Sequence, residues 1–314
     1  MPKTKRKAED PWGPAPTFSK YQPPKKKFSM RKGNEVTNFY DILSKEKEYK
    51  TKKVEYSNQD SIQIDVPFMM SISGKTGSGK TNVALDIIKN INCFDKIFLC
   101  VKDDEEPLYR WLTNKIRDVE KKTGAQILTV ITEIEKIPYV ADLNREVNNL
   151  FIFDDLISEK DKLLKKVEEY YIRGRKMNAS CMFLSQSYYS IPKVIRKNCF
   201  YIILKHIAQA TDLKRILVDY SQLDISFRKL NELYHEAIDG SQFNFFMIDL
   251  VTKDDDKKFR INYEGIPASE WKNESQNSKR QTNKNEEKES RIENSYENQP
   301  SVWSTIQQKA QRSI

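Results

Sequence analysis

The sequence is poor in glycine, cysteine and histidine, and it has no long apolar run. Nine of its 314 residues are glycine, four are cysteine and two are histidine, and no two cysteines form a CxxC pair. This pattern argues against a disulfide framework or a zinc site and predicts reduced, mostly buried thiols. No run approaches the about 18 apolar residues of a membrane span, and the N-terminal residues lack the apolar segment of a secretory signal. We therefore expect an intracellular protein without a membrane partner.

Positive charge is concentrated at one end of the chain, whose net charge is +9. Residues 1–33 hold ten basic and two acidic side chains among six prolines, whereas residues 34–269 hold 36 of each sign. Residues 1–33 are predicted to form a disordered arm that contacts nucleic acid or directs nuclear import, with a solubilising tail as the alternative. Residues 270–314 are polar and poor in aliphatic side chains, so we predict a mostly disordered tail. The folded domain is predicted to span residues 34–269.

Short apolar runs alternate with helical patterns through this middle region. Such alternation is typical of an α/β fold with a mostly parallel sheet covered by helices on both faces. Before the first run, we expect a helix near Phe39–Glu46 and an added strand or hairpin around Lys53–Val66. The predicted strands are Val66–Ser71, Asp95–Val101, Gln126–Thr132, Asn149–Phe153, Ala179–Ser185, Phe200–Lys205 and Asn244–Leu250. The predicted helices are Asn82–Asn90, Pro107–Lys122, Lys160–Arg173, Asp212–Val218 and Phe227–Ile238.

One glycine-rich segment carries the strongest functional signal. It reads GKTGSGKT, fits the pattern GxxxxGK[ST], and lies between a predicted strand and a predicted helix. Such a loop points backbone N–H groups at phosphates, and the helix dipole adds to the anion site. Lys80 is predicted to reach the β- and γ-phosphates of ATP and Thr81 to ligate Mg²⁺; the alternative is a glycine turn with a solvent-exposed lysine. The predicted phosphate-binding residues are Gly74, Lys75, Thr76, Gly77, Ser78, Gly79, Lys80 and Thr81.

An acidic pair ends a later apolar strand, which reads LFIFDD. We predict that Asp154 holds the Mg²⁺ shell and that Asp155 polarises the attacking water, as in the Walker B element of P-loop enzymes. The pair could instead cap a helix N-terminus, a position that aspartate favours, and both roles can coexist.

Four further residues are candidates for the reaction itself. Gln186 follows the predicted strand Ala179–Ser185, and ligands lie at the carboxyl ends of strands in open parallel sheets. It is predicted to sense the γ-phosphate or orient water, with an ordinary loop glutamine as the alternative. Arg173, Arg175 and Arg196 are candidates for stabilising transferred charge from a neighbouring subunit, or else complement helix C-termini.

The order of these features resembles the FtsK–HerA superfamily of P-loop ATPases. The likeness covers roughly residues 64–210 and is greatest to the poxvirus-type genome-packaging ATPases of large DNA viruses, virophages and Polinton-like elements. It is carried by GKTGSGKT, then FIFDD, then RGRKMNASCMFLSQSYYSIPKVIRKN. The resemblance implies a RecA-like ATPase that uses ATP and Mg²⁺ to move double-stranded DNA into a preformed capsid.

The same resemblance implies a ring homo-oligomer, a pentamer or hexamer, that docks on a capsid or vertex protein in the host nucleus or viral factory, or within the virion. It makes Lys80 and Thr81 the phosphate and metal residues, Gln186 the sensor, and Arg175 the first choice for the finger acting in trans. One departure concerns Asp155, since many superfamily members have glutamate there and aspartate is one methylene shorter.

Three other functions fit parts of the sequence. A nucleoside or nucleotide kinase would use residues 173–176 as an arginine-bearing lid. Another DNA-dependent ATPase or helicase would share the phosphate loop and the acidic pair. A non-hydrolysing module would bind nucleotide and DNA without turnover. The sequence lacks the NKxD motif of GTPases and the LSGGQ motif of ABC ATPases, which disfavours both classes.

Overall fold

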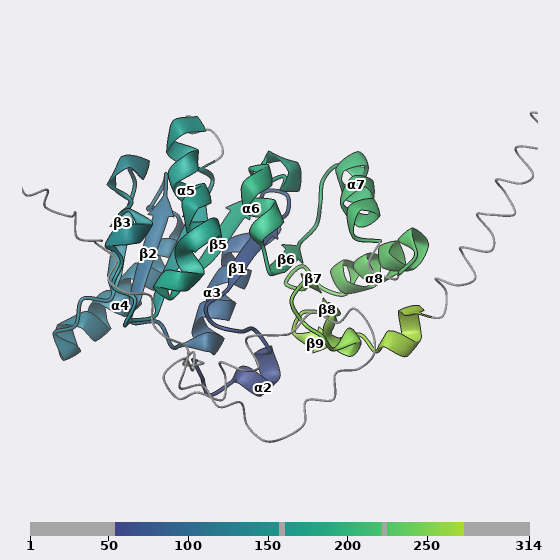
Figure 1. Cartoon of the computed structure of the whole chain (residues 1–314), viewed down its shortest axis with the longest axis horizontal. Coiled ribbons are helices and arrows are strands. Elements are labelled where there is room, and N and C mark those ends of the chain that lie inside the picture. Colours follow the sequence, from purple (N-terminus) through teal and green to yellow (C-terminus); the bar gives the residue numbers. More distant parts are fainter. Residues whose placement is uncertain (1–53, 157–160, 222–224, 273–314) are drawn as a thin grey trace, which may run out of the picture. The chain divides into compact units, whose positions relative to one another are not determined.

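The computed structural model describes residues 54–156, 161–221 and 225–272 (Figure 1). All of these residues belong to one compact unit, Lys53–Ile314. The predicted arm over residues 1–33, the predicted helix near Phe39–Glu46 and residues 273–314 of the predicted tail lie outside the described residues.

A nine-stranded sheet lies at the centre of the described residues, in the order β3-β2-β4-β5-β1-β6-β7-β8-β9. The strands from β3 to β6 in this order are parallel, whereas β7, β8 and β9 pair antiparallel. The prediction of an α/β fold with a mostly parallel sheet is confirmed. The strands are β1 Met69–Ser73, β2 Lys96–Val101, β3 Leu128–Ile131, β4 Asn149–Asp154, β5 Ala179–Ser185, β6 Tyr201–Leu204, β7 Phe246–Asp249, β8 Phe259–Ile261 and β9 Glu264–Gly265.

The helices begin and end at local sequence signals. Pro107 is the first residue of α4, and Gly124 ends that helix with φ +72°. The Ser226 side chain caps α8 by accepting the backbone N–H of Lys229 at 3.2 Å. No helix of the described residues is long and apolar enough to cross a membrane. The helices are α2 Gln59–Ile62, α3 Lys80–Ile91, α4 Pro107–Thr123, α5 Asp161–Arg173, α6 Lys193–Asn198, α7 Ala210–Tyr220 and α8 Phe227–Asp239, with a 3₁₀ turn, η6, at Gly174–Met177.

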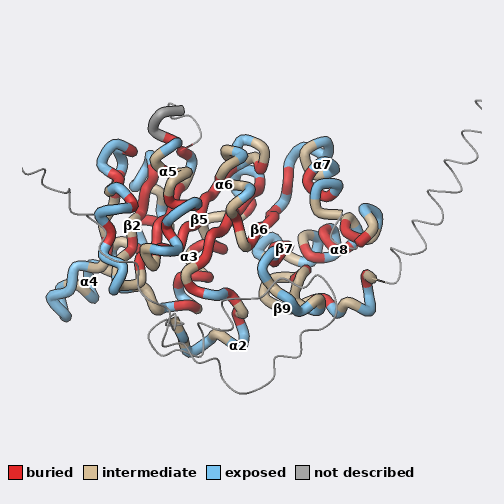
Figure 2. The backbone as a smooth tube through the Cα atoms, in the orientation of Figure 1, coloured by how far each residue is buried: buried red, intermediate tan, exposed pale blue. Residues whose placement is uncertain are grey.

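Both faces of the sheet are buried, as Figure 2 shows by the red strands. Neighbouring residues on a strand join opposite clusters: Met69 and Cys181 lie on one face, Met70 and Met182 on the other. The helices α5, α6, α7 and α8 cover the first face, and α3 and α4 cover the second. This double burial explains why the strands are near-continuous apolar runs in the sequence.

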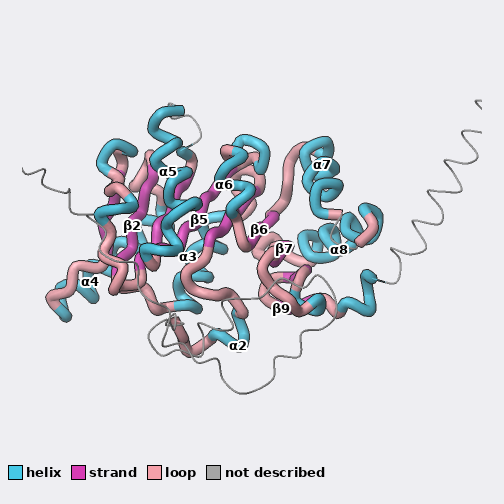
Figure 3. Tube along the Cα trace, in the orientation of Figure 1, coloured by secondary structure: helices cyan, strands magenta, loops and turns pink. Residues whose placement is uncertain are grey.

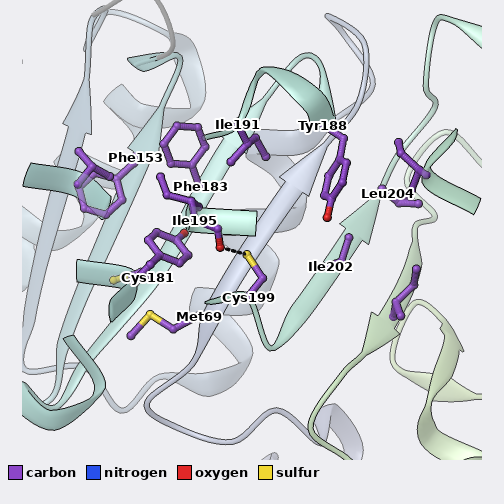
Figure 4. Packing of buried hydrophobic residues seen from close by; sticks show 14 of the residues in the cluster. Met69, Phe153, Cys181, Phe183, Tyr188, Ile191, Ile195, Cys199, Ile202 and Leu204 are labelled. Atoms are coloured by element: carbon purple, nitrogen blue, oxygen red, sulfur yellow. Dashed lines mark hydrogen bonds between the residues drawn. The ribbon is translucent and has the colours of Figure 1, made fainter. Parts of the chain in front are cut away.

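The cysteines belong to this packing rather than to any bridge. Figure 4 shows Cys181 and Cys199 among apolar side chains, with the Cys199 thiol donating to the Ile195 carbonyl at 3.3 Å. Cys100, Cys181 and Cys199 are buried and Cys93 is half-buried, all as free thiols. The prediction of unpaired, mostly buried thiols is therefore confirmed.

The prediction of a strand or hairpin around Lys53–Val66 is wrong. Among residues 54–66 the structure has only the short helix α2 and irregular backbone, drawn as loop in Figure 3. Here backbone N–H groups donate to side-chain hydroxyls in place of a neighbouring strand. The N–H of Asp65 donates to the Tyr201 hydroxyl at 2.9 Å, and the N–H of Phe68 donates to the Ser180 hydroxyl at 3.2 Å. The alternating apolar residues are buried without forming a strand.

The fold also extends past the predicted boundary at residue 269. Residues 268–272 are helical, and the Trp271 side chain is fully buried against Phe259 with the ring planes at 85°. The Trp271 indole N–H donates to the Ile266 carbonyl at 3.2 Å. Trp271 is thus part of the core and not of the predicted tail.

Candidate active site at the carboxyl edge of the sheet

Three predicted site elements follow neighbouring parallel strands. The strands β4, β5 and β1 lie side by side, with Leu184 opposite Asp154 and Ser185 opposite Ser73 (Figure 1). The phosphate loop follows β1, the acidic pair ends β4, and Gln186 follows β5 between them. The register therefore brings these residues, far apart in the chain, to one edge of the sheet.

The phosphate loop is anchored to the strands on both sides of β1. The backbone N–H of Gly74 donates to the Ser185 carbonyl at 3.1 Å, and that of Lys75 donates to the His206 carbonyl at 2.8 Å. These bonds hold the start of the loop to the ends of β5 and β6. The loop is thus shaped by the sheet before any ligand binds.

The end of the loop leaves backbone donors unused by the helix. The first intrahelical bond of α3 runs from the Val83 N–H to the Gly79 carbonyl at 3.0 Å. The N–H groups of residues 80–82 precede that bond and so have no partner within the helix. These amides and the helix dipole lie where the predicted anion site requires them.

Two glycine positions in the loop have a clear physical reason. Gly79, which precedes α3, has φ +85°, a conformation that residues with a Cβ rarely adopt. At Gly74, a Cβ would lie 2.5 Å from the Cβ of Lys205 and 2.7 Å from the Ser78 hydroxyl. A side chain at either position would displace the loop.

Lys80 is the first residue of α3, and its side chain turns back over the loop. Its Nζ donates to the Gly74 carbonyl at 2.9 Å and to the Lys75 carbonyl at 3.3 Å. Burial lowers the pKa of Lys80, while the charges of Asp154, Asp155 and Glu106 oppose that shift. The lysine head thus lies between the phosphate loop and the acidic residues of the neighbouring strands.

Asp154 and Thr81 both lie near the phenol of Tyr109 on α4. The Tyr109 hydroxyl donates to Asp154 Oδ2 at 2.6 Å, and the Thr81 hydroxyl acts to lower the pKa of the same phenol. Burial raises the pKa of Asp154, against the effects of the Tyr109 bond and the Lys80 charge. A carboxylate and a hydroxyl within reach of one phenol oxygen are the hard oxygen ligands that Mg²⁺ prefers, so these residues fit the predicted metal.

Asp155 differs sharply from its neighbour. Its side chain is exposed, and its φ of +53° turns the chain away from the strand. Aspartate is one of the few residues that tolerate this left-handed conformation. Asp155 is therefore exposed to solvent beside the end of β4, and its charge still acts on Lys80.

Gln186 is exposed at the turn that follows β5. The Ser185 hydroxyl holds this turn by donating to the Ser187 carbonyl at 2.7 Å, and the Ser187 hydroxyl donates to Asp212 at 3.2 Å. Gln186 thus lies at the same edge as the phosphate loop and the acidic pair, with its side chain available to a ligand.

Arg173 and Arg175 lie away from this edge within the chain. Arg173 ends α5 and pairs with Glu169 at 2.7 Å, and Arg175 on η6 lies 5.3 Å from the centre of the Phe200 ring. Both precede the first residue of β5 and so lie at the amino edge of the sheet. Their predicted role in trans stays a prediction.

Arg196 is engaged within its own chain. Its Nε donates to the Ile191 carbonyl at 3.0 Å, and its guanidinium lies 5.4 Å from the Tyr188 ring centre and 5.0 Å from that of Tyr189. These contacts brace the segment that leads into α6, which is a structural role. The predicted role of Arg196 as a finger is untested.

Three site residues were missed by sequence reasoning. Tyr109 and Glu106 approach the acidic pair from the start of α4, and Lys205 underlies the phosphate loop. The acidic run DDEEP that follows the strand KIFLCV was a usable signal for Glu106, because that strand also ends at this edge. Nothing in the sequence distinguishes Tyr109 or Lys205 from ordinary core residues.

Lys205 is a buried cation behind the phosphate loop. Its side chain is 1% exposed, and its Nζ donates to the Gln242 carbonyl at 2.8 Å and the Asn244 carbonyl at 2.5 Å. Burial lowers the pKa of Lys205 to about 8. The lysine therefore fastens the segment before β7 to the strand beside the phosphate loop.

This combination of fold and site matches a known family. Residues 54–232, which run from before β1 into α8, match the model of the family described as Poxvirus A32 protein. The chain is a member of the Poxvirus A32 protein family. The predicted resemblance to poxvirus-type ATPases is thereby confirmed.

Relatives within the A32 family are known from poxviruses. The chain is 30% identical over 141 residues to the DNA packaging protein OPG160 of Variola virus, a match that covers 43% of this chain and 52% of that protein. The OPG160 protein of Vaccinia virus (strain Western Reserve) gives the same figures. The chain thus spans about half the length of the curated relatives it matches.

Solved structures of two kinds are similar to this A32 family member. The genome packaging NTPase B204 of Sulfolobus turreted icosahedral virus 2, in complex with AMP, aligns with a TM-score of 0.46 and 14% identity over 63% of this chain and 98% of that one. The cytoplasmic domain of EssC aligns with a TM-score of 0.38 and 11% identity over 51% of this chain and 35% of that one.

Proposed function

We propose that this chain is an ATPase that drives double-stranded DNA into a preformed viral capsid. The observation that carries the proposal is the convergence of the phosphate loop, Lys80, Thr81 and Asp154 at one sheet edge in a member of the Poxvirus A32 protein family. The relatives named as DNA packaging proteins support the packaging role, and the phosphate loop with its neighbouring residues supports ATP as the nucleotide that drives it.

The site residues divide the work of ATP binding among them. The loop amides and Lys80 bind the β- and γ-phosphates, where the lysine replaces its present carbonyl partners by phosphate oxygens. Thr81 and Asp154 would hold Mg²⁺, which when bound neutralises charge on the phosphate oxygens. Gln186 orients the attacking water or senses the γ-phosphate from the strand between them.

Assembly into a ring homo-oligomer is part of the proposal. The described residues place Arg173 and Arg175 at the edge opposite the phosphate loop, so a finger from this chain would have to act on a neighbour's nucleotide. Arg175 is exposed and is the first candidate for that role. The proposed partners are further copies of the chain, in a pentamer or hexamer, DNA, and a capsid or vertex protein.

The position of residues 173–176 weighs against a kinase. A lid must close over the phosphates, but this segment precedes β5 and contacts the start of β1: a Cβ on Gly174 would lie 3.3 Å from Met69 Cε. The segment therefore lies at the wrong edge to cover ATP in the same chain.

Action inside the infected cell, in the nucleus or a viral factory, follows from the packaging role and is proposed with it.

Steady-state ATP hydrolysis with and without double-stranded DNA tests the proposal. We expect hydrolysis that rises with DNA and with protein concentration and vanishes in Lys80→Ala. Phosphoryl transfer to a nucleoside would establish a kinase instead. Nucleotide binding without turnover under any condition would establish a non-hydrolysing module.

A further inference from the structure

Glu106 brings a third carboxylate to the site from a neighbouring strand. The strand β2 runs parallel to β4, with Val101 opposite Asp154, so the segment after β2 leaves the sheet beside the acidic pair. Glu106 ends that segment and immediately precedes Pro107, the first residue of α4. Three residues later on the same helix, Tyr109 donates to Asp154. The start of α4 therefore packs against the metal-binding carboxylate.

The fold makes no use of the Glu106 carboxylate. It occupies the N-cap position of α4, yet its side chain makes no capping hydrogen bond. Its Oε2 atom is buried and has no hydrogen-bond partner among the described residues. Buried polar atoms are almost always paired in native proteins, and the exceptions are explained by strain, by a catalytic role or by a bound water or ion.

The charges around Glu106 are those of the proposed site. Burial raises the pKa of Glu106, the negative charges of Asp154 and Asp103 raise it further, and the positive charge of Lys80 opposes them. The carboxyl group thus lies within electrostatic reach of both the lysine that would bind the γ-phosphate and the aspartate that would hold the metal.

Asp155 lacks these properties. It is exposed, and its backbone conformation turns it out of the sheet. The half-buried Glu106 carboxylate, whose pKa is raised by burial, is a stronger base for a nearby water than a fully solvated carboxylate. Glu106 instead brings its carboxylate from the segment between β2 and α4, and this carboxylate is half-buried.

We propose that Glu106, rather than Asp155, is the catalytic base that takes a proton from the attacking water. This inference rests on the proposed function and names the base of that same site. The water oxygen forms a bond to the γ-phosphorus, and the bond from that phosphorus to the β,γ-bridging oxygen breaks. One water proton moves to Glu106 Oε2 and then to solvent, which leaves ADP and phosphate and restores the carboxylate.

The test is single-turnover hydrolysis of radiolabelled ATP by the full chain in the presence of double-stranded DNA, with ATP affinity measured in parallel. In Glu106→Gln we expect hydrolysis to fall at least about 100-fold while ATP affinity stays within about threefold. Nucleotide recovered from the quenched variant is expected to be ATP and not ADP. A residue with only a structural role would not trap ATP in this way.

Two variants serve as controls. Glu105→Gln removes the neighbouring carboxylate, which is exposed and pairs with Arg110 at 3.5 Å, and it is expected to match the wild type. Asp155→Asn is expected to slow hydrolysis less than about tenfold. If Glu106→Gln does not fold, Glu106→Asp answers the question: withdrawing the carboxylate by one methylene is expected to slow hydrolysis at least about tenfold with ATP still bound.

Several outcomes overturn the proposal. They are a Glu106→Gln hydrolysis rate within about threefold of the wild type, a loss of ATP affinity that accounts for the loss of rate, or an unchanged rate in Glu106→Asp. A larger loss in Asp155→Asn than in Glu106→Gln would return the role to Asp155. A wild-type chain that binds ATP but never hydrolyses it would remove the proposed function itself, and this inference with it.

Discussion

The two edges of the parallel sheet differ in whether their polar side-chain atoms have hydrogen-bond partners. At the amino edge, the Asn149 amide donates to the carbonyls of Asn144 and Val147, and the Asn178 amide donates to the Asn148 side chain at 2.7 Å. At the carboxyl edge, Glu106 Oε2 and the Ser78 hydroxyl are buried without partners among the described residues. These amides at the amino edge are satisfied by the chain itself, whereas these two atoms at the carboxyl edge, like the Ser71 and Ser73 hydroxyls of β1, have no partner among the described residues.

Burial alone therefore does not identify function in this molecule. Asn149 is 3% exposed and fully engaged in structure, while Ser78 is 7% exposed and has an unused hydroxyl. The informative quantity is whether a buried polar atom has a partner, because a buried polar atom without one costs free energy. Variants at the carboxyl edge should therefore change ATP hydrolysis, and variants at the amino edge should change the free energy of unfolding.

The largest effect is expected from Lys80→Ala at the carboxyl edge. Losing the cation that is proposed to bind the phosphates should reduce ATP hydrolysis by roughly 10²–10³-fold or more, with no large change in the free energy of unfolding. Lys89→Ala is the matched control, since this exposed lysine lies in the last turn of the same helix. Equal losses in both variants, measured by phosphate release, would show that the effect comes from α3 and not from the site.

The next largest effect is expected from Lys205→Met, which should change how the free energy of unfolding depends on pH. Burial lowers the pKa of Lys205 to about 8, so the unfolded chain binds more protons than the folded one up to the ordinary lysine pKa of about 10.4. This group's contribution to the free energy of unfolding is therefore flat below pH about 8 and rises above it. Lys205→Met should lose that rise.

Denaturant unfolding at a series of pH values measures this difference. The free energy of unfolding of the wild type should gain on that of Lys205→Met by roughly 1–3 kcal/mol between pH about 7.5 and 10. Parallel pH profiles for the two proteins would mean that Lys205 keeps its ordinary pKa in the folded state.

A smaller effect, on stability alone, is expected from Asn149→Ala at the amino edge. Removing its amide takes away the donor to the carbonyls of Asn144 and Val147, which should lower the free energy of unfolding by about 0.5–1.5 kcal/mol. Hydrolysis per folded molecule should not change. Asn198→Ala is the control and should cost less, because that side chain donates to the Val194 carbonyl within its own helix. A change in ATP affinity in Asn149→Ala would break the contrast between the two edges.

The smallest effect concerns Cys93, which precedes β2 at the amino edge. Burial and the charge of Asp95 raise its pKa to about 11, and burial raises the pKa of Cys199 to about 12. Alkylation at pH about 8 should therefore be slow and confined to half-buried Cys93 in the folded protein, as read by mass spectrometry. Hydrolysis should survive the modification, and inactivation in step with Cys93 labelling would place that residue nearer the site than the structure does.

Sequence reasoning located the elements that local patterns determine. The strand β5 has the predicted bounds and α4 begins at the predicted Pro107, because a continuous apolar run and a proline are local signals. The strands β8 and β9 were not predicted, since three and two residues carry no periodicity. Apolar residues alternate at positions 62, 64 and 66, which is typical of a strand. The backbone N–H groups of Asp65 and Phe68 instead donate to the hydroxyls of Tyr201 and Ser180, more than a hundred residues later in the chain.

The site residues also divide into those that local sequence patterns predict and those that only the fold brings together. The phosphate loop and the acidic pair could be predicted because each is contiguous in the sequence. Tyr109 meets Asp154 across 45 residues, and Glu106 gains its meaning only from the order in which β2, β4 and β5 lie in the sheet. The acidic run DDEEP marks Glu106 only as one carboxylate among several, and the fold shows that its charge acts on Asp154.

Lys205 also has a mechanical meaning. Its Cβ packs against Gly74 on one side, and its ammonium holds the carbonyls of Gln242 and Asn244 on the other. One side chain therefore touches both the phosphate loop and the segment that enters β7, two parts of the chain about 170 residues apart. A displacement of the loop toward Lys205 would have to be accommodated by that segment.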